Sequence, residues 1–283
     1  MTADVDTAMA HAAPPLAPGA PSSTRRRWSR LRAAIAVLVT QLAILIVFLA
    51  FWEHATPKNS AAAFMFGSPS AIAGFLGQMV RDGSLWRDTS ITGMETLLGF
   101  FVGNLVGTLI GLSLWYSRFV SRVVEPFVIA LGSIPIIALA PIVIIWFGTG
   151  LISKVAMSTL SVVIVALVTS YKGAVGVDPD QINLMKTLGA SKFQIFRKLV
   201  VPASLTDIFA GLKLTVGFAL IGAIVGEFMS SSDGLGHAIF KAGSLYVIPK
   251  VFAALVVTIA LALVLTFLVG KIERLLMPWR HHV

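Results

Sequence analysis

Residues 186–204, KTLGASKFQIFRKLVVPAS, are a polar segment between two long apolar stretches of the chain. Gly189 is suited to end a helix in the left-handed conformation, and Pro202 is suited to end a second one. Between them, Ser191 and Gln194 have the spacing of a capping box, in which each side chain bonds to the backbone of the other residue. The segment therefore predicts ordered helical structure, which a simple connection would not need.

A first short helix is predicted just before this point, in VDPDQINLMKTLG, residues 177–189. Asp178 is a suitable N-cap, and Pro179 is a suitable first helical residue. Two interpretations follow: helices that lie on lipid headgroups with their basic residues toward anionic lipid, or a docking element for a cytoplasmic partner. Each predicted helix has an apolar face, made of Leu184, Met185 and Leu188 in the first and of Phe193, Phe196, Leu199 and Val200 in the second.

The composition of the chain is typical of a membrane protein. Of its 283 residues, 57% are hydrophobic and 12% are charged, whereas about 25% are charged in an ordinary soluble domain. The net charge of +9 does not indicate nucleic-acid binding, because the basic residues are dispersed between apolar runs. The absence of cysteine excludes disulfides and thiolate metal sites.

The chain contains several apolar runs that are long enough to cross a bilayer. A helix rises about 1.5 Å per residue, so a span needs roughly 20 apolar residues. We expect a disordered cytoplasmic tail before the first span, an outer segment with a short amphipathic helix capped by Ser68 or Ser70 after it, and a cytoplasmic tail at the end. The predicted segments are the tail 1–32, the spans 33–52, 89–115, 126–147, 151–171, 206–228 and 248–270, the outer segment 53–88 and the tail 271–283.

The distribution of basic residues predicts the orientation. With the N-terminus in the cytoplasm, fifteen of the 22 lysines and arginines fall on the cytoplasmic side and six on the other, with Lys213 inside a span. Because Lys and Arg are retained in the cytoplasm, this orientation is favoured. Six spans then place both termini and residues 178–202 in the cytoplasm.

The cytoplasmic segment resembles the loop of the membrane subunits of bacterial ABC importers. That loop has the pattern Glu-Ala-Ala, three residues, Gly, nine residues, aliphatic, any residue, aliphatic, Pro. Here Gly189 is followed after nine residues by LVVP, residues 199–202. The Glu-Ala-Ala positions hold Asn183, Leu184 and Met185, so the glutamate of the pattern is absent.

The resemblance covers about residues 65–275. Within the family, this chain is similar to the branch that imports sulfonates, taurine and nitrate, notably in IPIIALAPIVIIWFGTG, residues 134–150, and GEFMSSSDGLG, residues 226–236. It implies an all-α integral membrane protein with six transmembrane helices in a type I ABC importer permease arrangement. The type-1 domain is expected at 85–275, with two short cytoplasmic coupling helices between spans four and five. The residues implied to couple to the ATPase are Asn183, Leu184, Met185, Gly189, Ala190, Ser191, Phe196, Leu199 and Pro202.

The resemblance also implies partners: a cytoplasmic ABC ATPase, an extracytoplasmic solute-binding protein and a second permease copy, in the bacterial inner membrane. The chain has no G-x-x-x-x-G-K-[ST] loop, so ATP and Mg²⁺ are expected on the ATPase. No catalytic residue, metal or cofactor is expected in this chain, because its histidines lack metal-ligand spacing and no catalytic triad pattern is present.

Several residues within the spans are candidates for packing or for the pathway. Close helix packing is expected along a four-residue repeat of glycine, inside one subunit or between two. The two prolines of span three should kink it, either to line the pore or as a purely structural bend. The glycines are Gly99, Gly103, Gly107 and Gly111, and the pathway candidates are Pro135, Pro141, Glu95, Asn104 and Glu227.

Two hypotheses for function remain. In the first, the chain is the pore-forming permease of an ATP-driven importer of a small solute, such as a sulfonate or another small organic anion. In the second, it is a self-sufficient carrier coupled to protons through Glu95 or Glu227. The ordered pair of cytoplasmic helices favours the first hypothesis, because a carrier would not need it.

Overall fold

The computed structural model describes residues 23–57 and 61–276, and these residues form helices and no strands. Two short non-α segments interrupt the α-helices, a 3₁₀ turn at Leu114–Tyr116 and a π-helical turn at Phe196–Val200. The helices are α1 Ser23–Ala55, α2 Ala61–Phe66, α3 Pro69–Arg81, α4 Ser84–Ser113, α5 Arg118–Gly132, α6 Ile136–Phe147, α7 Leu151–Val175, α8 Pro179–Thr187, α9 Lys192–Ile195, α10 Val201–Ser230, α11 Leu235–Ser244 and α12 Ile248–Leu276.

Helix α1 belongs to one compact unit, and the remaining helices belong to a second. Its apolar part, Ile35–Ala55, is long enough to cross a membrane. The helix begins at Ser23, so the prediction of a disordered tail up to residue 32 is wrong for residues 23–32. Arginine, leucine and alanine favour the helix there, which extends it beyond the apolar run. The rest of the predicted tail, residues 1–22, lies outside the described residues.

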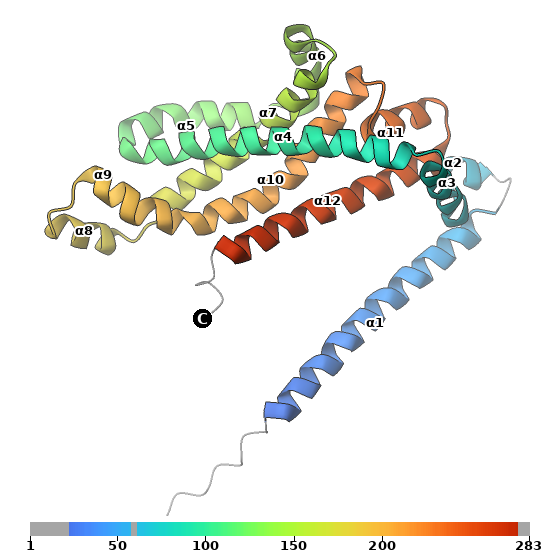
Figure 1. The fold of residues 1–283 in the computed structure, drawn as a ribbon, viewed down its shortest axis with the longest axis horizontal. Coiled ribbons are helices and arrows are strands. Elements are labelled where there is room, and N and C mark those ends of the chain that lie inside the picture. The colour runs from blue at the N-terminus through green and yellow to red at the C-terminus, as the bar shows by residue number, and fades with distance from the viewer. Residues whose placement is uncertain (1–22, 58–60, 277–283) are drawn as a thin grey trace, which may run out of the picture. The chain divides into compact units, whose positions relative to one another are not determined.

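Helix α7 lies between α4 and α10 at the centre of the second unit (Figure 1). Glycines allow this close contact. A Cβ built on Gly103 would lie 2.7 Å from Val162, and one on Gly222 would lie 2.6 Å from the carbonyl oxygen of Met157, so any larger residue would push the helices apart. The buried core formed here includes Phe100, Val162, Ala166, Val216 and Ala219.

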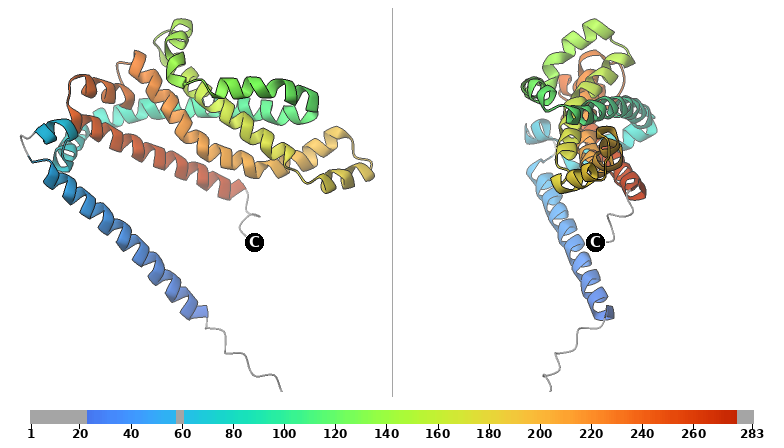
Figure 2. Two further views of the ribbon diagram at one scale, coloured as in Figure 1. Left: turned by 180° about the vertical axis from the view of Figure 1, so that it is seen from behind. Right: turned by 90° about the vertical axis from the view of Figure 1, so that its left-hand side faces the viewer.

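The second unit has two ends with different structures. Helices α8 and α9 lie at one end, which we call the coupling-loop end, and α2, α3 and α11 lie at the opposite end, the α11 end (Figures 1 and 2). Ser68 caps α3 by accepting a hydrogen bond from Ala71 N at 3.3 Å, as predicted. Helices α4 and α10 run the length between the two ends, and α12 runs from the α11 end toward the coupling-loop end (Figure 1).

The predicted span 126–147 is not one straight helix. It is divided between α5 and α6, which meet at an angle of 94°. Pro135 forms the bend with φ −60° and ψ 119°, and its missing N–H prevents the helix from continuing through it. The kink predicted at Pro135 is therefore confirmed, whereas Pro141 lies inside α6 without ending it.

The second coupling helix is not separate from the fifth span. The prediction that Pro202 ends it is wrong, because α9 continues through the π-helical turn into α10. Pro202 is the second residue of α10, directly after the π-helical turn, and it does not end the helix there. The predicted C-terminal tail is also partly helical, since α12 extends to Leu276; residues 277–283 lie outside the described part.

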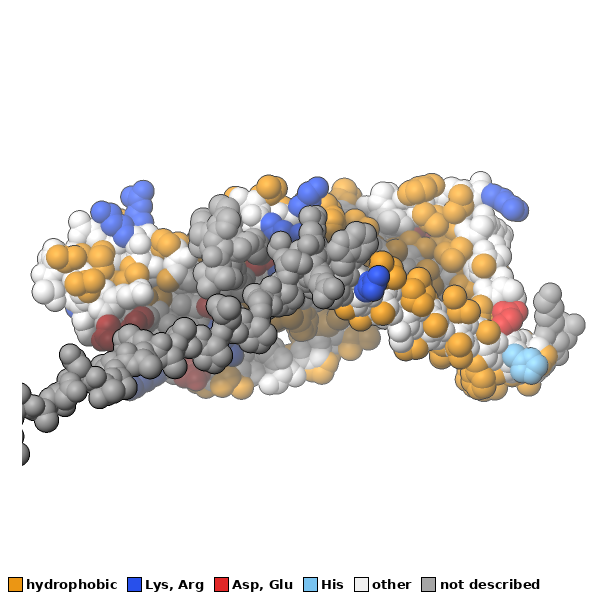
Figure 3. All heavy atoms as spheres, turned by 90° about the horizontal axis from the view of Figure 1, so that it is seen from below, with side chains coloured by type: hydrophobic (Ala, Val, Ile, Leu, Met, Phe, Trp, Pro, Cys, Tyr) orange, Lys and Arg blue, Asp and Glu red, His pale blue; other side chains and the backbone are white. Residues whose placement is uncertain are grey.

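Five of the described helices are long and apolar enough to cross a membrane, and the α5–α6 pair would make six. Hydrophobic side chains are widespread on the face of the molecule seen in Figure 3, with charged groups scattered between them. Exposed large side chains on α4, α5 and α12, such as Phe101, Phe127 and Phe267, contribute to this apolar surface. These features fit a protein whose solvent is largely lipid.

Candidate functional site

The coupling loop, residues 178–202, has well-formed helix ends. Asp178 caps α8 by accepting a hydrogen bond from Asp180 N at 2.9 Å. Gly189 has φ +77°, the left-handed conformation predicted for the end of the helix. The capping box is also confirmed, because Gln194 N donates to Ser191 Oγ and Ser191 N donates to Gln194 Oε1.

One face of the coupling loop is anchored to the ends of α4 and α7. Phe196 packs against Trp115 and Tyr116, with ring centroids 5.7 and 4.8 Å apart. The side chain of Lys192 donates to the carbonyl oxygen of Tyr116 at 2.5 Å. Three other predicted coupling residues pack, like Phe196, against the buried apolar residues at this end of the second unit: Met185, Ala190 and Leu199.

The coupling loop also exposes three large apolar side chains. Leu184 is 61% exposed, Leu188 is 74% exposed and Phe193 is 62% exposed. The predicted residues Asn183, Gly189, Ser191 and Pro202 are also exposed. Phe193 and Phe196 are predicted to lie on one apolar face, but only Phe196 packs against the buried apolar residues, whereas Phe193 is exposed.

At the α11 end, Glu227 is fully buried and holds the start of α11. Its carboxylate accepts hydrogen bonds from Thr92 Oγ1 at 2.6 Å and from Gly236 N at 2.5 Å. Thr92 in turn accepts from Leu235 N at 2.9 Å. The first N–H groups of a helix have no partner within the helix, so α4 and α10 supply the cap of α11.

Two glycines allow this approach. A Cβ on Gly234 would lie 2.3 Å from Glu227 Oε1, and one on Gly236 would lie 2.7 Å from Glu227 Oε2. Gly234 also has φ +104°, a conformation that favours glycine. The motif GEFMSSSDGLG is therefore one structural unit, in which the glutamate and the two glycines fit each other.

Glu95 and Lys154 complete a buried polar cluster with Asp88, Thr92 and Glu227, which we call the outer polar cluster. Glu95 is 3% exposed, and its Oε2 accepts no hydrogen bond from the described residues. Its carboxyl group interacts with the charges of Glu227 and Lys154. The Lys154 ammonium donates to the carbonyl oxygens of Thr149 and, at 3.0 Å, Ser230. These contacts join α4, α7 and α10.

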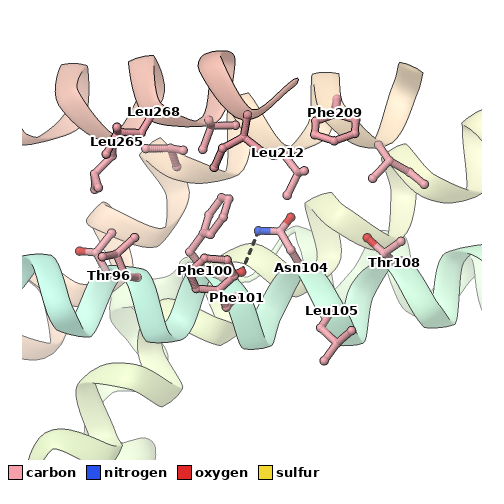
Figure 4. Close-up of a pocket in the computed structure, with 15 residues that line it drawn as sticks. Thr96, Phe100, Phe101, Asn104, Leu105, Thr108, Phe209, Leu212, Leu265 and Leu268 are labelled. Carbon is pink, nitrogen blue, oxygen red and sulfur yellow. Dashed lines mark hydrogen bonds between the residues drawn. The ribbon is translucent and has the colours of Figure 1, made fainter. Parts of the chain in front are cut away.

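Asn104, another pathway candidate, cross-links two helices. Its Nδ2 donates to the Phe100 carbonyl oxygen at 2.8 Å (Figure 4), and its Oδ1 accepts from Thr215 Oγ1 at 3.0 Å. The side chain borders a cavity of about 570 Å³ between α4, α10 and α12. Apolar side chains such as Phe209 and Leu265 form most of its wall, as Figure 4 shows.

The bend between α5 and α6 borders a second cavity of about 350 Å³, which we call the elbow cavity. Gly132 and Ile136 come from the two sides of the bend, and Ser161 and Phe218 come from α7 and α10. Among the described residues, no charged side chain lines it.

The predicted pathway residues differ in their exposure. Pro135 and Pro141 are exposed, whereas Glu95, Asn104 and Glu227 are buried within the subunit.

All four glycines of the α4 repeat lie against α7. A Cβ on any of them would come within 2.7 Å of a Ser158, Val162 or Val163 atom or of the Leu167 carbonyl oxygen.

Three residues of these polar contacts are not among the predicted site residues: Thr92, Lys154 and Thr215. The spacing of Thr92, Glu95 and Thr96 on one face of an apolar helix is the signal that would have found part of the cluster.

Comparisons with known proteins agree with this geometry. Residues 103–278 match the family of binding-protein-dependent transport system inner membrane components. The riboflavin transport system permease protein of Chloroflexus aurantiacus is 34% identical over 83% of this chain and 88% of that protein. A putative aliphatic sulfonates transport permease protein of Bacillus subtilis is 27% identical over 83% of this chain and 85% of that protein.

A solved structure shows the same fold. The MetNI methionine ABC transporter in an inward-facing conformation matches 69% of this chain and 96% of that chain, with a TM-score of 0.62 and 22% identity. This chain therefore belongs to the family of binding-protein-dependent transport system inner membrane components, the multi-pass permease subunits of ABC importers, and has the type I permease fold.

Proposed function

We propose that this chain forms the translocation pore of an ATP-driven importer in the bacterial inner membrane, with both termini in the cytoplasm. Two copies form the pore, two ATPase subunits bind ATP and Mg²⁺, and an extracytoplasmic protein delivers the solute. The observation that carries this proposal is the coupling loop, which exposes Leu184, Leu188 and Phe193 and is anchored by Phe196. Apolar side chains exposed on a rigid support are suited to fill a groove of a partner.

The anchoring gives the loop a mechanical role. Because α9 is continuous with α10 through the π-helical turn, a displacement of Phe193 is transmitted directly to a helix that reaches the α11 end. ATP-driven closure of the ATPase subunits would then move the loop as a rigid body and change the access of the pore.

The alternative, a self-sufficient proton-coupled carrier, requires a carboxyl group that exchanges protons with water. Glu227 is 0% exposed and accepts hydrogen bonds from Thr92 and Gly236. Its neighbour Glu95 is also enclosed. These environments support a structural role for both carboxyl groups and favour the importer.

For the solute, we infer a small organic molecule, with a planar uncharged heterocycle as the first candidate. The elbow cavity has no charged side chain, and the relative that transports riboflavin is more similar to this chain than the sulfonate relative. A sulfonate-like anion is the second candidate, since the sulfonate relative covers as much of the chain. The test is a thermal-shift assay on the solute-binding protein encoded next to this chain, with riboflavin, a pyrimidine and taurine as ligands. If taurine alone raises the melting temperature of that protein, the sulfonate-like anion becomes the first candidate.

Co-purification of the ATPase tests the proposed docking. We would express the tagged chain with its chromosomal neighbours and compare it with the double variant Leu188→Asp and Phe193→Asp. Because both side chains are exposed, the variant should fold, and its recovery of ATPase should fall at least about tenfold, as expected when central apolar contacts are lost.

The control is Leu245→Asp, which places the same charge at an exposed position at the α11 end and should keep the ATPase. Equal recovery from the native chain and the double variant would exclude the loop as the docking surface. If no ATPase binds and the purified chain transports solute with a proton gradient, the carrier hypothesis is correct instead.

A further inference from the structure

A polar hollow lies at the coupling-loop end, beside the coupling loop. It has a volume of about 520 Å³, and its wall comes from the start of α5, the end of α7 and helix α8. It differs from the cavities along the spans, because basic, hydroxyl and amide side chains line much of it. The polar residues used below are Arg118, Ser121, Arg122, Tyr171, Asn183 and Lys186.

The charges of the hollow are unbalanced. Arg118 and Arg122 lie one turn apart on α5, Lys186 lies on α8, and among the described residues the only carboxylate in the wall is Glu125. Three positive charges and one negative charge leave a net charge of +2. Within the described part of the chain, none of the three basic groups forms an ion pair within 4.0 Å.

Other groups in the wall also favour an anion. Ser121 Oγ donates its hydrogen to the hydroxyl oxygen of Tyr171, which leaves the tyrosine hydrogen available to donate elsewhere. Asn183 contributes an amide with two N–H donors. Helices α5 and α8 begin at this hollow and α7 ends there, so two positive helix ends face one negative end, and the helix dipoles add only a small positive contribution to that of the basic side chains.

Position 183 explains why the charge is unbalanced. The loop pattern that this chain resembles has glutamate there, and this chain has the neutral Asn183. A carboxylate at this position would border the same hollow as the two arginines and supply a negative charge within the chain. Asn183 is shorter than glutamate and carries no charge, so the hollow is left for an anion from outside.

We propose that this hollow binds a phosphate-bearing anion, through Arg118 and Arg122 on one side and Lys186 and Asn183 on the other. Arginine binds phosphate oxygens in a bidentate manner, and lysine adds a point charge. The bound anion links α8 to α5 and so holds the helix that carries Leu184 and Leu188. The effect on ATPase coupling rests on the proposed function above, whereas anion binding itself does not.

Two sources have this chemistry. One is the headgroup of an anionic phospholipid in the cytoplasmic leaflet, where basic pockets between helices bind such groups. The other is a soluble phosphate compound of the cytoplasm. The volume of the hollow is sufficient for a group larger than phosphate alone.

The experiment measures binding to the purified full chain without any partner. Native mass spectrometry compares phosphatidylglycerol with phosphatidylcholine, and calorimetry titrates inorganic phosphate and pyrophosphate. The variants are Arg118→Gln with Arg122→Gln, and separately Asn183→Glu, which keeps both arginines. The control is Arg197→Gln with Lys198→Gln, which removes two exposed basic residues from the same loop outside the hollow.

We expect both hollow variants to weaken binding at least about tenfold, because charge-assisted bonds are lost or are taken by the new carboxylate. The control should change affinity by less than about twofold. Preference for phosphatidylglycerol without phosphate binding identifies the lipid source, and phosphate or pyrophosphate binding identifies the soluble source. The proposal is overturned if no probe binds, or if the control weakens binding as much as the hollow variants do. If the arginine variant fails to fold, normal affinity in Asn183→Glu would equally overturn it.

Discussion

Glu227 shows what a single buried carboxylate contributes to this protein. It connects α10 to the N–H groups at the start of α11 and to Thr92 on α4, and Gly234 and Gly236 provide the space for it. A buried acceptor in this position satisfies donors that would otherwise have no partner at all. At the residue scale, hydrogen bonds to side chains therefore hold the start of α11 in place.

Removal of this carboxylate should destabilise the protein. Glu227→Ala leaves the donors of Gly236 and Thr92 unsatisfied, and each such buried group costs about 1–3 kcal/mol. The melting temperature of the purified protein in detergent should fall clearly, whereas Glu227→Gln, which keeps one acceptor oxygen, should lose less. If the two variants had equal melting temperatures, the hydrogen bonds would not be the source of the stability.

At the scale of elements, the glycine seam between α4 and α7 is the main determinant of packing. The repeat at every fourth residue places Gly99, Gly103, Gly107 and Gly111 on one face of α4, where the backbones of the two helices approach closely. In a bilayer, such packing takes the place of the hydrophobic effect, because lipid tails are as apolar as the side chains.

The seam gives a prediction with an internal control. In Gly107→Ala the new Cβ would lie 2.4 Å from the Val163 carbonyl oxygen, so α4 and α7 must separate. Overpacking of this kind costs about 1–3 kcal/mol. Gly217 has no atom within 4 Å of a new Cβ, so Gly217→Ala should leave the melting temperature unchanged or raise it. Equal losses in the two variants would show that helix separation is not the cause.

At the scale of the whole molecule, the distribution of basic residues and the fold support the proposed topology. The coupling loop and the end of α12 lie toward the same end of the second unit, and the α11 end lies opposite (Figures 1 and 2). The basic residues are concentrated in segments assigned to the cytoplasm.

Cysteine labelling tests this topology without background, because the chain has no cysteine of its own. Leu245→Cys and Leu188→Cys place a thiol at an exposed position at either end. In intact cells lacking the partner subunits, a membrane-impermeant maleimide should label only the Leu245→Cys variant. Leu188→Cys should react only after permeabilisation, and the reverse pattern would invert the proposed orientation.

Some local features were predicted correctly because they depend on neighbouring residues. The Ser191–Gln194 capping box, the left-handed Gly189 and the bend at Pro135 each follow from the chemistry of a few consecutive residues. The error at Pro202 has the same origin, since the local pattern did not show that a π-helical turn would carry the helix past the proline.

The sequence by itself determined the membrane class, the number of apolar runs, the coupling-loop helices and the family resemblance, because composition, periodicity and spacing are local properties of the chain. Tertiary structure alone decided which residues meet across the fold: Thr92 with Glu227, Thr215 with Asn104, and Lys213 in an ion pair with Glu273. The first two pairs are separated by 135 and 111 residues. Their contacts depend on how α4, α7, α10 and α12 pack, and a side-chain pattern within one helix carries no information about its partner helix.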